Sequence, residues 1–306
     1  MSRGFARIAV VFATLVLPCF VLAAPFRAYL SSSGSDSNPC TVTQPCRLLP
    51  AALAAVADGG EIWILDSANF NAGTVAVAKS VSIVALPGQI ASVVAAGGAP
   101  AIMISAPGVA VRLRNLAFSR NAANPGTYGI EMTDGASLSI EGSTFTGLDH
   151  YAIYPHEVNA TVTVKNTSFS AITDYAVYPR NVPAVNIIGS QFTDTKGAAY
   201  FESPGTTFTL TDSTIVNCDI GIGFTPTPVG DIHALVTHTR IEKCNIGING
   251  VNAGSPSMDV SLGDSFIAGN GTGVVASGVQ VYSAGNNQFS GNTTDVLGSL
   301  TPAPLR

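Results

Sequence analysis

The sequence predicts an all-β protein, a right-handed parallel β-helix (a solenoid) with a short N-terminal capping helix. Short alternating stretches of apolar and polar residues recur along the chain, and patterns of long helices are almost absent. Only 11% of the 306 residues are charged, which would be unusual for a helical enzyme. An apolar residue also recurs every 23 to 27 residues, a period typical of solenoids.

Residues 1–24 have the features of a secretory signal peptide. Arg3 and Arg7 precede an apolar run over residues 8–16, and small residues follow at Ala23 and Ala24. No later apolar run is long enough to cross a bilayer. We therefore expect an exported protein, periplasmic or extracellular, that does not span the membrane.

The charge balance excludes nucleic acid as a partner. Removal of residues 1–24 takes two arginines and no acid from the 14 basic and 19 acidic side chains, which leaves a formal charge of 12 − 19 = −7. A surface so acidic and so poor in lysine would repel phosphate backbones.

Residues 25–60 are predicted to form an N-terminal cap. The segment Pro50–Asp58 is rich in Ala and Leu and predicts one short helix, directly before the predicted strand of residues 61–65. A solenoid exposes its apolar axis at each end, so we expect this helix to cover that axis; a local surface helix is the alternative. At the other end, residues 299–306 are expected to be a flexible tail.

Four cysteines remain after the signal peptide, an even number in a compartment that permits disulfides. Cys40 and Cys46 bracket a short loop, which predicts a local disulfide. Cys218 and Cys244 each follow a recurring apolar residue by three positions and so occupy one position on neighbouring coils. Strands stack roughly 4.8 Å apart, which fits a disulfide; two free buried thiols are the alternative.

Residues 61–298 are predicted to form the parallel β-helix. Each coil is aligned on one apolar anchor, and seven of the eight residues three positions before the anchors are Asn, Gly or Asp, which tolerate a left-handed backbone. A tight bend is therefore expected at one corner of every coil, with three short strands per coil. The anchors are Phe118, Phe145, Phe169, Phe192, Ile215, Ile241, Phe266 and Phe289, and the corner residues are Asn115, Gly142, Asn166, Gly189, Asp212, His238, Gly263 and Asn286.

A family resemblance rests on the coil pattern and on the opening section. That section contains NPCTVTQPCR at residues 38–47, an Ala-rich run to Val56, and GGEIWILD at residues 59–66. The chain resembles the pectate-lyase-like superfamily of β-helices, and its opening section is similar to exported bacterial β-helix repeat proteins without a settled activity. The resemblance implies the fold, and it implies a glycan groove along the outer face of one strand per coil.

The chain departs from the enzymes of that superfamily. It has no dense Asp cluster of the calcium-dependent pectate-lyase kind, no paired Arg motif with an intervening Pro, and no Asp or Gly-His-Gly signature of polygalacturonases. We therefore name no cofactor and no metal ligand, and calcium stays open without a recognisable site.

One eight-residue sequence pattern occurs twice in the chain. Tyr151–Val158 reads YAIYPHEV and Tyr175–Val182 reads YAVYPRNV. Tyr154 and Tyr178 each lie nine residues after an anchor, so they should stack one coil apart, facing outward if the aliphatic residue before each points into the core.

The residue that differs between the copies opens the loop after the strand, as His156 in one and Arg180 in the other, and the next coil offers Tyr200, Phe201 and Glu202 near the same place. Aromatic faces flanked by polar and cationic groups suit sugars, so we predict a polysaccharide or cell-surface glycan as the partner. In a lyase, Arg180 or His156 would be the base or would neutralise a uronate. The candidate substrate-binding residues are Tyr154, Tyr178, Tyr200, Phe201 and Glu202.

Asp149 and Asp174 complete the candidate catalytic set with Arg180 and His156. They precede the two copies of the repeated pattern and could lie about one coil apart. This distance resembles the separation of the two carboxylates in a retaining glycosidase. The alternative is that each Asp caps a turn.

Two functions follow from these patterns. The first is an exported β-helix that binds, and in an enzyme would cleave, a polysaccharide along its outer strand face. The alternative is a non-catalytic structural or adhesive β-helix of the periplasm or cell surface, in which stacked tyrosines only stabilise the fold. Charged ladders such as Arg114, Glu141 and Lys165 need no function. The sequence does not predict the oligomeric state.

Overall fold

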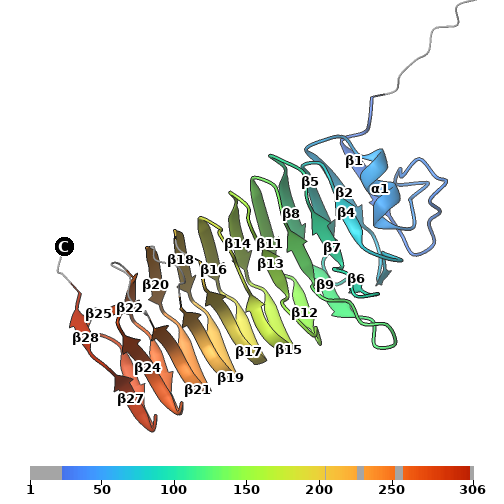
Figure 1. Ribbon diagram of the computed structural model, residues 1–306. Helices are drawn as coiled ribbons and strands as arrows, with labels where there is room; N and C mark the ends of the chain where they lie inside the picture. The colour runs from blue at the N-terminus through green and yellow to red at the C-terminus, as the bar shows by residue number, and fades with distance from the viewer. Residues whose placement is uncertain (1–22, 204, 226–230, 252–257, 304–306) are drawn as a thin grey trace, which may run out of the picture.

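The chain forms a parallel β-solenoid whose coils stack from the N-terminal to the C-terminal end (Figure 1). The computed structural model describes residues 23–203, 205–225, 231–251 and 258–303. All but two residues of the predicted signal peptide lie outside the described residues. Within the described ranges, no helix has the length and apolar character needed to span a membrane.

The solenoid has three faces, which we name in chain order. The first face is a single 12-stranded sheet in which all neighbours are parallel. Its strands are β1 (Arg27–Leu30), β2 (Gly60–Ile64), β5 (Val81–Ala85), β8 (Ala110–Arg114), β11 (Ser137–Glu141), β14 (Thr161–Lys165), β16 (Ala184–Ile188), β18 (Thr206–Thr211), β20 (Ile232–Thr237), β22 (Met258–Gly263), β25 (Gln280–Ser283) and β28 (Leu300–Pro302).

The second and third faces are joined in the middle of the molecule by long strands that bend from one face to the other. These long strands are β15 (Ser168–Val177), β17 (Gln191–Phe201), β19 (Thr214–Phe224) and β21 (Arg240–Val251). The second face also holds β3 (Ala68–Asn69), β6 (Ala91–Ala95), β9 (Leu116–Arg120), β12 (Thr144–Thr146), β23 (Phe266–Ala268) and β26 (Gln288–Ser290). The third face also holds β4 (Val75–Val77), β7 (Ile102–Ile104), β10 (Ile130–Met132), β13 (Ile153–Pro155), β24 (Thr272–Ser277) and β27 (Thr294–Leu297).

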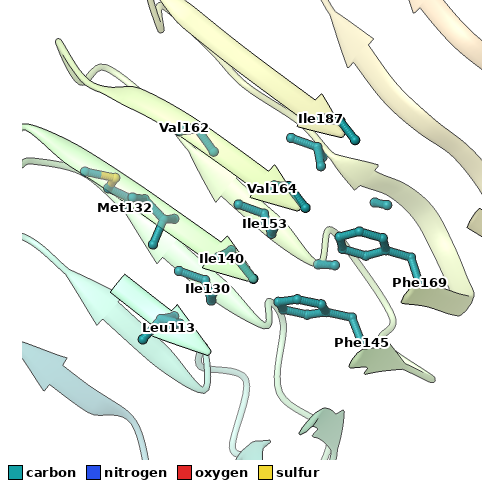
Figure 2. Packing of buried hydrophobic residues seen from close by; sticks show 14 of the residues in the cluster. Leu113, Ile130, Met132, Ile140, Phe145, Ile153, Val162, Val164, Phe169 and Ile187 are labelled. Atoms are coloured by element: carbon teal, nitrogen blue, oxygen red, sulfur yellow. The ribbon is translucent and has the colours of Figure 1, made fainter. Parts of the chain in front are cut away.

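The core consists of columns of equivalent residues, because successive side chains of a strand alternate between the two sides of its sheet. Figure 2 shows one such column on the first face, Leu113, Ile140, Val164 and Ile187, with the rings of Phe145 and Phe169 opposite it. The phenylalanine column of the second face stacks nearly flat, with ring centroids 4.4 to 5.0 Å apart from Phe118 to Phe192. Side-chain stacking therefore adds to the hydrogen bonds that hold each coil on the next.

The predicted corner is confirmed for six consecutive coils. Asn115, Gly142, Asn166, Gly189, Asp212 and His238 all have φ between 48° and 60°. His238 adopts this backbone although His is not a typical turn residue. The structure has a second left-handed corner that the sequence analysis missed, two residues after the anchors, at Gly147, Ala171, Asp194, Asn217, Lys243, Gly269 and Gly291.

The anchor predicted at Phe266 is wrong by one residue. Ile267 is in register with Ile241 and Phe289 and is fully buried, whereas Phe266 faces outward under the guanidinium of Arg240. The left-handed corner of this coil accordingly falls on Asp264 and not on the predicted Gly263. A shift of one residue exchanges the two sides of a strand, so it changes which residue fills the core.

The N-terminal helix is confirmed as α1 (Leu49–Ala55), which lies at the first end of the solenoid (Figure 1) with Leu49, Ala52 and Leu53 buried. The predicted cap region also contains β1, which pairs with β2 and so belongs to the first face. The predicted tail is wrong for Leu300–Pro302, because β28 pairs with β25; residues 304–306 lie outside the described residues.

Both predicted disulfides are confirmed. Cys40 and Cys46 are bonded with Cα atoms 4.6 Å apart, and Cys218 and Cys244 are bonded with Cα atoms 4.4 Å apart. The second bond joins β19 to β21, whose residues Cys218 and Cys244 are in register.

The register of β23 gives a direct stability test. Replacement of Ile267 by Ala removes buried methylene groups and should lower the free energy of unfolding by about 2–5 kcal/mol. The neighbouring change Phe266→Ala removes an outward ring and should cost about 1 kcal/mol or less. Urea denaturation of the two variants measures both values, and a larger loss for Phe266→Ala would contradict this register.

Candidate functional site

Six of the eight tyrosines of the chain gather on one part of the third face. They lie on four successive coils, just before, within or just after β10, β13, β15 and β17. We call them the tyrosine cluster: Tyr128, Tyr151, Tyr154, Tyr175, Tyr178 and Tyr200.

One row of the cluster was predicted. Ile153 is in register with Val177, and Val177 with Ala199, so the tyrosine after each of them occupies the same position on consecutive coils. As expected, Ile153 and Val177 are fully buried and the tyrosines point outward. Tyr178 is nevertheless only 8% exposed, because neighbouring rings cover it.

A second row was missed. Tyr128, Tyr151 and Tyr175 lie three residues before successive positions of the first row. The rings of the two rows stack on each other across coils: Tyr151 lies 4.2 Å from Tyr178 with the ring planes 7° apart, and Tyr175 lies 4.6 Å from Tyr200. The repeated three-residue offset in the sequence was the signal that could have revealed this row.

Glycines give the last rings of both rows a flat support. Tyr175 is in register with Gly197, and Tyr200 with Gly223. A Cβ atom at Gly197 would lie 2.7 Å from the Tyr175 ring, and one at Gly223 would lie 2.1 Å from the Tyr200 ring. A Cβ at Gly197 would also lie 1.9 Å from the carbonyl oxygen of Ile220, so Gly197 is required by a backbone and a ring, and Gly223 by the Tyr200 ring.

A groove of about 310 Å³ runs over the later coils of the cluster, from Tyr151 to β19. It brings together four tyrosine rings, three carboxylates and one ammonium group. Its lining residues are Tyr151, Asp174, Tyr175, Tyr178, Lys196, Tyr200, Glu202, Asp219 and Ile220.

The charged groups of the groove are held by specific contacts. The Nζ atom of Lys196 lies 3.2 Å from the carboxylate of Asp174 and 5.1 Å from the ring centroid of Tyr175. The hydroxyl of Tyr178 donates a hydrogen bond to Glu202. The side-chain amide of Asn245 donates to Asp219 at 2.9 Å.

Three of the four groove tyrosines have a raised pKa. Burial raises the pKa of Tyr151 to about 12, and burial also raises the pKa of Tyr175 well above the usual value of a phenol. For Tyr178, burial raises the pKa first and the hydrogen bond to Glu202 raises it further. A phenol with so high a pKa stays protonated at neutral pH and cannot act as a general base.

His156 and Arg180 are brought together as predicted, one coil apart in register. They gather around Tyr154 and do not line the groove. The ring of His156 stacks on Tyr154 at 4.3 Å and its Nε2 lies 3.1 Å from the carboxylate of Glu131, while Arg180 donates to the Tyr154 hydroxyl at 3.5 Å. That hydrogen bond raises the pKa of Arg180, which keeps the guanidinium charged and removes it as a candidate base.

The two candidate aspartates have separate partners. Asp149 pairs with Arg120 at 2.8 Å, and Asp174 pairs with Lys196 and also accepts a hydrogen bond from the backbone N–H of Tyr175. Each of the two carboxylates is therefore held by a cation of its own. The contact with the Tyr175 N–H is the capping role that was the alternative for Asp174.

Phe201 is wrong as a substrate-binding residue. It is fully buried, with its ring 4.6 Å from Phe208 and 5.3 Å from Phe224. Tyr200 and Phe201 are adjacent in one strand, so alternation directs the first outward and the second inward. The remaining predicted binding residues, Tyr154, Tyr178, Tyr200 and Glu202, belong to the tyrosine cluster or line its groove.

Metal ligands do not gather in the part of the chain that the structure describes: no group of three or more His, Cys, Asp or Glu residues is arranged to hold an ion there.

Comparison with known proteins agrees with the coil architecture. The model for the right handed beta helix region matches residues 101–294. The chain belongs to the right-handed β-helix family.

Two solved structures share the architecture of this right-handed β-helix. The pectate lyase Pel9A is 14% identical with a TM-score of 0.51, over 92% of this chain and 78% of the lyase. The alginate lyase from Paenibacillus sp. str. FPU-7 is 13% identical with a TM-score of 0.56, over 90% of this chain and 99% of the lyase. At these identities the likeness shows the fold alone. None of the curated proteins compared with the chain matches it.

The raised pKa values predict sensitivity to alkali. Above about pH 10 the unfolded chain loses tyrosine protons that the folded protein keeps, so the unfolded state binds fewer protons and the free energy of unfolding falls as the pH rises. Tyr151→Phe cannot ionise and should make this fall shallower. Urea denaturation between about pH 9 and pH 11.5 measures the slope, and equal slopes for wild type and Tyr151→Phe would contradict the burial of that phenol.

Proposed function

We propose that this right-handed β-helix protein binds a glycan in the groove of the tyrosine cluster. The observation that carries the proposal is the convergence of aromatic and polar groups from successive coils on one concave surface, although this groove does not include His156 and Arg180. A volume of about 310 Å³ lies at the lower end of the range for ligand pockets. It suits a short segment of a chain that continues beyond the groove.

The chemistry of the lining supports a sugar ligand. Sugar rings present apolar C–H groups that can contact the exposed parts of Tyr151 and Tyr200, which are partly exposed. Their hydroxyl groups can donate to the carboxylates of Asp174, Glu202 and Asp219. The ring stacks fix the orientation of these groups before any ligand arrives, which lowers the entropic cost of binding.

Two further findings are consistent with this proposal. The two solved structures described above are lyases of pectate and alginate on the same architecture. The two disulfides suit an oxidising compartment, which agrees with an exported protein that meets glycans outside the cytoplasm. We propose binding rather than cleavage, because each candidate aspartate is paired with its own cation.

Titration with a panel of neutral, basic and acidic oligosaccharides tests the proposal. We expect at least one glycan to bind, without new reducing or unsaturated ends. Tyr200→Ala should weaken that binding about fivefold, since a lost ring contact costs roughly 1 kcal/mol. Calorimetry gives the affinity, and thermal melting checks that the variant is folded.

Tyr282→Ala is the matched control, because Tyr282 lies on the first face in β25. This control should bind like wild type. Equal losses for the two variants, or no binding to any glycan by folded wild-type protein with and without calcium, would overturn the proposal and leave the tyrosine cluster as a stabilising ladder. New chain ends that disappear in His156→Ala would show an enzyme.

A further inference from the structure

We infer, building on the proposed function, that the groove selects a glycan that carries ammonium groups, an amino-sugar chain, over a uronate chain. The groove is concave and walled by aromatic rings, and its charge decides which sugar it takes. Three carboxylates and one ammonium group line it, so its formal charge is 1 − 3 = −2.

Two of the three carboxylates have no cation beside them among the described residues. Glu202 accepts a hydrogen bond from the Tyr178 hydroxyl, and Asp219 accepts one from the Asn245 amide. Both donors are neutral, so they orient the carboxylates without cancelling their charge. A ligand ammonium group could therefore donate charge-assisted hydrogen bonds to these carboxylates.

The protein's own Lys196 shows how the groove holds an ammonium group. Its Nζ atom sits between the carboxylate of Asp174 and the ring of Tyr175. An aromatic face attracts a cation through the negative charge of its π system. The side chains of Glu202 and Asp219 and the ring of Tyr200 offer the same combination of carboxylate and ring within the same groove.

The one ammonium group of the groove, Lys196, is paired with Asp174, and the two cationic candidates of the repeated pattern are engaged outside the groove. Arg180 donates to Tyr154, and His156 contacts Glu131; neither residue lines the groove. A uronate would therefore place its carboxylate near Glu202 and Asp219, where repulsion between like charges opposes binding.

Three hexasaccharides separate these ligand classes: a hexamer of β-1,4-linked glucosamine, its fully N-acetylated counterpart, and a hexamer of galacturonate. Calorimetry at about pH 6 and low salt keeps the amino groups protonated. We expect the glucosamine hexamer to bind at least about tenfold more tightly than the N-acetylated hexamer, and the galacturonate hexamer to bind most weakly. High salt should reduce this preference.

Variants of the lining give sharper expectations. Glu202→Gln combined with Asp219→Asn keeps the shape and one acceptor oxygen of each side chain, and it should reduce glucosamine binding to the level of the N-acetylated hexamer. Lys196→Met removes a cation that competes for Asp174 and should strengthen glucosamine binding severalfold. Lys165→Met is the control, because Lys165 ends β14 on the first face, and it should change nothing.

The outcomes distinguish this inference from the proposed function. Equal binding of the glucosamine and N-acetylated hexamers, or tighter binding of galacturonate, would overturn the inference and leave glycan binding intact. Weaker glucosamine binding by Lys196→Met would also overturn it. Absence of binding to all three hexamers and to the wider panel would overturn the proposed function itself.

Discussion

Stacking of the coils in register is the constraint on which the rest of the molecule depends. Each strand hydrogen-bonds to the equivalent strand of the next coil, roughly 4.8 Å away, so residues of equal phase form a column. The flat phenylalanine stack from Phe118 to Phe192 and the Cys218–Cys244 bond both arise from this geometry. The two left-handed corners keep fixed spacings from the buried anchors, so differences in coil length fall in the other connections.

The candidate site is formed by columns of equivalent residues whose side chains point outward from the coils. The two rows of tyrosines lie three residues apart in the sequence, and their rings stack on one another across neighbouring coils. Each row ends where the next coil has a glycine, Gly197 or Gly223, at the equivalent position. The rings thus wall a groove whose polar groups come from β15, β17, β19 and the residue after β17. The rings are packed against one another, and the charged side chains that line the groove are its three carboxylates and Lys196.

Sequence reasoning correctly predicted which residues lie next to each other on neighbouring coils when this depends only on the repeat period. It failed when the prediction required the exact position of a residue within its coil. The register of His156 with Arg180 followed from their equal distance from the anchors. Ile267 and Phe266 are both apolar, so composition could not tell which one enters the core. Phe201 was misplaced for the same reason. The groove charge depends on residues of three coils that no single sequence stretch contains.

Hydrogen exchange with and without the glucosamine hexamer tests the central claim most directly, because it maps where a glycan meets the stacked coils. We expect slower exchange in the C-terminal halves of β15, β17 and β19, which flank the groove, and unchanged exchange along β14, β16 and β18 of the first face. Protection confined to the first face, or protection at the groove that persists in Tyr200→Ala, would contradict the account.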